Sequence, residues 1–97
     1  MKKKTQKKIK LYIYVEYNDD CPSEMIIEGY LTKKEALQRL AERFKSQHED
    51  LSPRQYRRGL INEGIDIDDD TYDNDYVSVR NFDDSIAHYY VEPMVVE

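Results

Sequence analysis

Carboxylate side chains are concentrated in the last third of the chain, and closely spaced carboxylates can bind cations or imitate the phosphates of a nucleic acid. Six aspartates fall within ten residues: Asp66, Asp68, Asp69, Asp70, Asp73 and Asp75. An EF-hand loop starting at the first of them would need glycine where the chain has Thr71, and a bidentate glutamate where it has Val77. We therefore expect no metal site. The segment predicts either a solvated acidic loop or, together with Asp83 and Asp84, an acidic surface that contacts a partner.

Basic side chains occupy the opposite end of the chain and one side of a predicted helix. Six of the first ten residues are lysines: Lys2, Lys3, Lys4, Lys7, Lys8 and Lys10. Arg54, Arg57 and Arg58 are spaced to share one side of a helix, and Arg39 and Arg43 lie one turn apart on another. Such arginines commonly form exposed ion pairs, here with Glu35, Glu42 or Glu63. With the lysines they could instead contact phosphates, so nucleic-acid binding is an open alternative.

The formal charge changes sign along the chain. Residues 1–10 carry +6 and residues 66–97 carry −9, while the whole chain carries −5. Like charges concentrated on one segment repel one another in a compact protein, so a chain that keeps them can use the field on a partner.

Nucleophiles and metal ligands are sparse. His48 and His88 are far apart in the sequence and have no ligand spacing around them. Cys21 follows Asp19 and Asp20, which should raise the pKa of its thiol and make it a poor nucleophile. We therefore expect a protein that is not an enzyme and holds no cofactor.

Length and composition indicate one small domain. The chain has 97 residues, of which 39% are hydrophobic and 36% charged. We expect a flexible Lys-rich tail over residues 1–8 and a single folded domain over residues 9–97. One cysteine excludes an internal disulfide, and no apolar run approaches the roughly 20 residues of a membrane span, so we expect a cytoplasmic protein that does not bind membranes.

Periodicity predicts the order strand, strand, helix, helix, strand, strand. Alternating residues indicate strands over 9–17 and 24–31, and later over 76–80 and 86–92. Thr32 with Glu35 predicts the start of one helix, which runs to about His48. A second helix of about three turns starts after Ser52, with Gly64 as its C-cap. We expect an exposed loop over 66–75, and the segment 94–96 either adds an edge or packs on the core.

These elements predict an α+β fold with an antiparallel sheet of about four strands and both helices on one face. If the aliphatic residues of the first strand face the helices, its tyrosines face away. The outer face then carries Tyr12, Tyr14, Ile26 and Tyr30. Tyrosine offers a large apolar area with a polar tip, so we predict a contact surface there, for a homodimer or for a foreign partner. Cross-strand tyrosine pairs without any partner are the alternative.

The segment 29–40, Gly-Tyr-Leu-Thr-Lys-Lys-Glu-Ala-Leu-Gln-Arg-Leu, resembles the start of many short proteins from phages and other mobile elements. Small size, acidity and abundant tyrosine are also similar to features of phage-encoded inhibitors such as anti-CRISPR proteins and DNA-mimicking antirestriction proteins. The resemblance implies an inhibitor that blocks a nucleic-acid-binding protein, and it assigns no individual residue.

Two functions therefore remain. The first is a protein-binding module whose acidic C-terminal surface mimics nucleic acid and occupies a basic groove on a protein partner. The second is a small nucleic-acid-binding regulator that uses the lysine-rich tail and the three arginines of the second helix.

Overall fold

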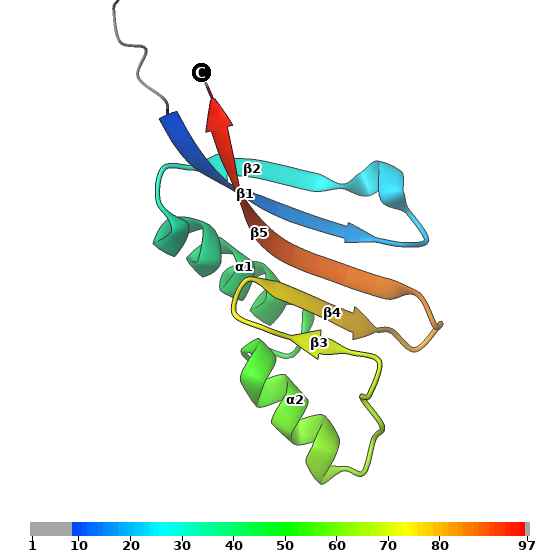
Figure 1. Cartoon of the computed structure of the whole chain (residues 1–97). Coiled ribbons are helices and arrows are strands. Elements are labelled where there is room, and N and C mark those ends of the chain that lie inside the picture. The colour runs from blue at the N-terminus through cyan, green and yellow to red at the C-terminus, as the bar shows by residue number, and fades with distance from the viewer. Residues whose placement is uncertain (1–8, 97) are drawn as a thin grey trace, which may run out of the picture.

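A computed structural model describes residues 9–96 and shows an α+β fold (Figure 1). The elements are β1 (Ile9–Asn18), the short 3-10 helix η1 (Pro22–Glu24), β2 (Ile26–Tyr30), α1 (Lys33–Gln47), α2 (Pro53–Asn62), β3 (Thr71–Tyr72), β4 (Tyr76–Arg80) and β5 (Ile86–Val96). All strand pairs are antiparallel, in the order β2-β1-β5-β4-β3. The predicted fold class is confirmed, but the sheet has five strands because β3 lies within the segment expected to be a loop.

The two longest strands, β1 and β5, pair along their whole lengths, from Ile9 opposite Val96 to Asn18 opposite Ala87. β5 therefore runs straight through Pro93 rather than ending before it. The N–H of Val91 bonds to the carbonyl of Asp75 on the β4 side of β5. Hydrogen-bonding directions repeat every second residue along a strand, so the nitrogen of Pro93 faces the same side as that of Val91. It lies beyond the end of β4, where none of the described strands needs a donor.

Both helices begin at the predicted caps. The Thr32 hydroxyl accepts the Glu35 N–H at 3.1 Å, and Ser52 and Gln55 form a reciprocal capping box. Only α1 lies across the sheet (Figure 1). α2 lies beside β3 at the sheet edge and reaches the core through Tyr56, whose ring meets Phe44 edge to face. The expectation that both helices cover the face is therefore correct for α1 alone.

The core lies between α1 and the sheet, and it contains the tyrosines expected on the other face. Tyr14 is completely buried, and Tyr12, Ile26 and Tyr30 pack against the core. The predicted exposed tyrosine surface is therefore wrong. β1 is apolar on both faces, so alternation identifies two faces without showing which one α1 covers.

Polar contacts explain why the face of β1 that carries the tyrosines packs against α1. Tyr14 and Glu16 are two residues apart on β1 and share a face, and the Tyr14 hydroxyl donates to Glu16 at 2.7 Å. Arg43 of α1 donates two hydrogen bonds to the same carboxylate. Turning β1 over would direct Ile13 and Val15 toward α1 instead and would remove the glutamate from its arginine.

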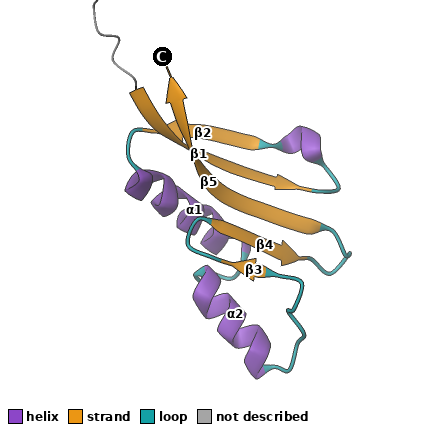
Figure 2. Ribbon diagram, in the orientation of Figure 1, coloured by secondary structure: helices purple, strands orange, loops and turns teal. Residues whose placement is uncertain are grey.

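The opposite face of the sheet is hereafter called the open face. It carries the odd-numbered residues of β1 and the even-numbered residues of β5, as the strand register requires. Large apolar side chains are exposed there, among them Ile9, Ile27, Met94 and Val96. Within residues 9–96, α1 covers the other face of the sheet, while α2 lies beside β3 at the sheet edge (Figure 2).

Candidate functional site

Three loops that are distant in sequence meet at one end of the sheet (Figure 2). They are the β1–β2 connection, the α2–β3 loop and the β4–β5 turn. Apart from Glu63, which caps the end of α2, they carry nine carboxylates, and we call this region the acidic end: Asp19, Asp20, Glu24, Asp66, Asp68, Asp69, Asp70, Asp83 and Asp84. Arg80 is the one arginine or lysine that these described segments and the adjoining strand ends contribute. The region is therefore strongly negative.

Phe82 projects from the middle of the acidic end. It lies at the tip of the β4–β5 turn and is fully exposed. It lines two hollows, one shared with the α2–β3 loop and one shared with the β1–β2 connection. Leaving the Phe82 side chain exposed forgoes about 2 kcal/mol of stability that its burial would contribute. Exposed aromatic residues are frequent anchors in protein interfaces.

The acidic end is held in shape by hydrogen bonds within its own loops. Asp70 accepts the backbone N–H of Arg80 at 3.1 Å, and Asp69 pairs with the Arg80 guanidinium. Asp83 accepts both the hydroxyl and the N–H of Ser85, which hold the pKa of its carboxyl below the usual value. The Asp83 carboxyl is therefore ionised at neutral pH. The hydrogen bonds and the ion pair hold Asp69, Asp70 and Asp83 in defined positions.

The structure brings together six of the eight aspartates predicted as a contact set. Asp73 and Asp75 lie in the β3–β4 turn instead, separated from Arg80 by the length of β4, which is about 13 Å. Asp75 also lies 4.0 Å from Lys33 of α1. These two aspartates therefore belong to a different part of the surface.

Sequence reasoning missed Asp19, Asp20, Glu24 and Phe82 as members of this region. The first three carry an ordinary turn signal, and only the β1–β5 register places their loop beside the β4–β5 turn. Phe82 did give a signal, because a large aromatic residue inside the short turn 81–85 has no strand or helix position from which to enter the core.

The structure describes some of the basic residues that were predicted, as an alternative, to bind nucleic acid. Lys2, Lys3, Lys4, Lys7 and Lys8 lie outside the described residues, and Lys10 is exposed on β1. Arg54, Arg57 and Arg58 are exposed on α2, where the Arg57 guanidinium lies over the Tyr72 ring at 6.0 Å. Within residues 9–96, none of the three forms an ion pair at 4.0 Å or less.

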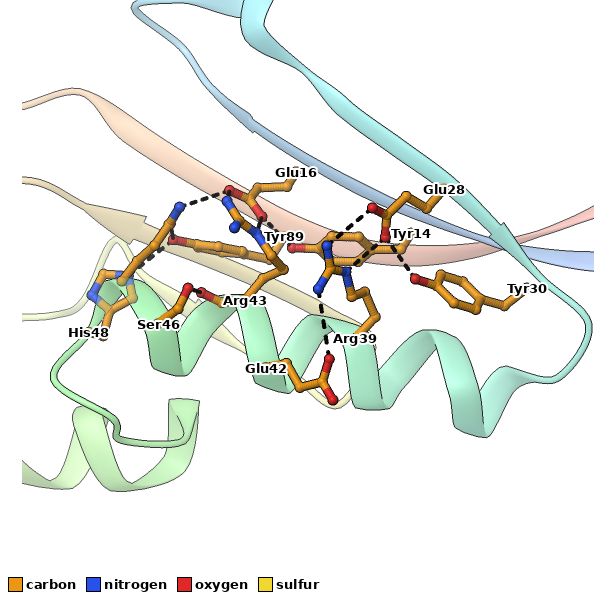
Figure 3. A network of polar contacts seen from close by, with 11 residues as sticks. Tyr14, Glu16, Glu28, Tyr30, Arg39, Glu42, Arg43, Ser46, His48 and Tyr89 are labelled. Carbon is orange, nitrogen blue, oxygen red and sulfur yellow. Dashed lines mark hydrogen bonds and ion pairs between the residues drawn. The ribbon is translucent and has the colours of Figure 1, made fainter.

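Arg39 and Arg43 are not available to a partner in the same way, because they join α1 to the sheet (Figure 3). Arg39 binds Glu28 through two nitrogens at 2.8 and 3.2 Å, and Arg43 binds Glu16 at 2.8 and 2.9 Å. Gln47 also donates to Glu16 at 3.0 Å. Of the predicted partners on the helices, Glu42 does contact Arg39, at 3.8 Å.

The pKa values of this network follow from burial and pairing. Burial alone would raise the pKa of Glu16, but hydrogen bonds from Arg43 and Tyr14 outweigh it and hold the pKa below its usual value. Burial raises the pKa of Tyr14 far above its usual value. His48 is buried against Phe44 and close to the Tyr89 hydroxyl, and burial lowers its pKa. Every buried side-chain nitrogen or oxygen of residues 9–96 has a partner, which is typical of structural polar groups.

The remaining residues with reactive side chains are either exposed or in contact with neighbouring side chains. Cys21 lies in the β1–β2 connection, where Glu24 and then Asp20 raise the pKa of its thiol. His88 stacks on Tyr17 and contacts Tyr76 and Asp19 on the open face. No group of three potential ligands in the described chain is placed to hold a metal ion, and none of its helices is long and apolar enough to cross a membrane.

Comparisons of the chain with protein-family models, with curated proteins and with solved structures found no match. The geometry of the molecule is therefore the basis for assigning a function.

Proposed function

We propose that the protein is a non-enzymatic binding module whose acidic end docks on the basic, nucleic-acid-binding groove of a partner protein. The single observation that carries this proposal is Phe82, fully exposed among the nine carboxylates of the acidic end. A solvated acidic surface needs no aromatic residue at its centre. A protein interface combines such an anchor with a charged rim.

The partner's chemistry follows from the charges. A nucleic acid would be repelled by the acidic end, whereas a surface rich in lysine and arginine would form charge-assisted hydrogen bonds with it. Proteins that bind nucleic acids have such surfaces. Blocking that groove would make the protein an inhibitor of the partner, in the manner of a DNA mimic.

The test uses two variants and a matched control. Asp68→Asn and Asp84→Asn together remove two charges from the acidic end, while Asp73→Asn and Asp75→Asn remove two from the β3–β4 turn. Asp84 has a positive φ of 69°, a conformation that asparagine tolerates well. Each protein is used to capture partners from the DNA-binding fraction of a host lysate, and Phe82→Ala is compared with them.

We expect wild type and the β3–β4 control to capture the same protein equally well. Phe82→Ala should weaken binding by about 2 kcal/mol, or about 30-fold in Kd, if Phe82 is an interface anchor. The acidic-end variant should bind more weakly and lose its salt dependence in part. Equal capture by all four proteins would exclude the acidic end as the binding surface.

A second candidate, direct nucleic-acid binding, is favoured by the three exposed arginines of α2. Arg54, Arg57 and Arg58 would contact phosphates together with the lysines of residues 1–8. A gel-shift titration at low salt checks it, and binding should fall steeply with salt and should be lost on deletion of residues 1–8. Absence of any shift on duplex or single strands would reject this function.

A further inference from the structure

The open face exposes an apolar surface that no other part of residues 9–96 covers. Ile27 is 63% exposed, Ile9 53% and Met94 51%. The register places Met94 opposite Leu11, and Val96 opposite Ile9, so these side chains form adjacent rows on β1 and β5. Strands that face water on one side normally alternate apolar and polar residues, and β1 does not.

We propose that a second copy of the chain covers the open face, in a twofold dimer that packs sheet against sheet. Four strands of about eight residues each present about 500 Å² in projection, so two copies would bury about 1,000 Å² or more. That area reaches the size at which specific protein interfaces begin. A foreign partner on this face is the competing outcome of the test.

Charge determines the direction in which the two copies pair. A twofold axis parallel to the strands would bring the two acidic ends together, each with nine carboxylates. An axis across the strands places them at opposite ends of the dimer. The second arrangement avoids the repulsion between the two acidic ends. Equivalent strands of the two copies, such as the two β1 strands, therefore run in opposite directions across the interface.

This arrangement makes a separate prediction for Glu92. Glu92 pairs with Ile13 near the middle of β1 and β5, and it is the charged group at the centre of the open face. An axis through the middle of these strands brings the two Glu92 carboxylates close together. Glu92→Gln should therefore strengthen the dimer by several-fold, because it removes a like-charge contact.

Sedimentation equilibrium of the full chain up to about 100 μM tests the dimer, a range that detects weak interfaces of this size. We expect a mass near twice 11.6 kDa. Ile27→Glu and Met94→Glu should each weaken self-association by more than tenfold. Ile61→Glu is the matched control, because Ile61 is similarly exposed but lies on α2. Far-UV circular dichroism of each variant checks that the fold is retained.

A spin label on Cys21 tests the orientation, because Cys21 is the only cysteine and is exposed at the acidic end. A twofold axis across the strands places the two labels on the order of 45 Å apart, whereas a twofold axis parallel to the strands places them within about 30 Å of each other. The longer distance supports the proposal. A monomer mass at every concentration, a dimer insensitive to Ile27→Glu and Met94→Glu, or the shorter distance would overturn it.

Discussion

Two arginines of α1 provide a direct measure of what the helix–sheet contacts contribute to stability. Arg43 and Arg39 each bind one sheet glutamate with two hydrogen bonds, so the two pairs have nearly the same geometry. They differ in burial. The Arg43 and Glu16 side chains are 27% and 11% exposed, whereas those of Arg39 and Glu28 are both 33% exposed.

Arg43→Ala should therefore destabilise the protein much more than Arg39→Ala. Removing one partner of a buried ion pair costs about 3–5 kcal/mol. Glu16 keeps hydrogen bonds from Tyr14 and Gln47, and Arg43 is partly exposed, so we expect a loss of about 2–3 kcal/mol. Arg39→Ala should cost about 1 kcal/mol or less, as partly exposed ion pairs do.

Urea unfolding followed by far-UV circular dichroism measures both changes, and the two variants have the same net charge. The double variant Glu16→Leu, Arg43→Met supplies a further check. It should be more stable than Arg43→Ala, because no uncompensated carboxylate stays buried. Equal losses for Arg43→Ala and Arg39→Ala would refute the reasoning, since they would show that burial of Glu16 does not determine the cost.

Three further predictions concern stability. Because burial lowers the pKa of His48, the unfolded chain binds its proton more readily, so the free energy of unfolding should fall as pH drops below the usual value of 6.5. His48→Asn should reduce this pH dependence in urea titrations, and an unchanged profile would contradict the assignment. Gly64 has a φ of 77°, so Gly64→Ala should lower stability by about 1 kcal/mol, and a gain in thermal midpoint would oppose this. Ser52→Ala removes a capping-box acceptor and should cost about 1 kcal/mol by urea unfolding, whereas no change would show that α2 does not depend on its cap.

The sequence predicts best those features that depend on neighbouring residues. Thr32 and Ser52 mark helix starts because each cap bonds to a backbone N–H three residues along the chain. The strands adjoining the hairpin turns were also predictable from alternation. The two-residue strand β3 was not, because Thr71 and Tyr72 form a strand only through pairing with Ser78 and Val77.

Alternation could not decide which face of β1 packs against α1. Tyr14 and Val15 are both suitable core residues, and both are buried in the structure. The choice depends on Arg43, which lies 27 residues beyond Glu16 and reaches it only after α1 has docked. The candidate site depends in the same way on distant pairing, since the β1–β5 register brings the loop of Asp20 to the turn of Phe82.

Displacement of DNA from the captured partner tests the proposed function most directly. Fluorescence anisotropy of a labelled duplex bound to the purified partner would be followed while the protein is added. We predict that wild type and the Asp73→Asn, Asp75→Asn control release the duplex, and that Phe82→Ala requires about 30-fold more protein. Wild type that binds the partner while the duplex remains bound would contradict the claim that the acidic end occupies its nucleic-acid-binding groove.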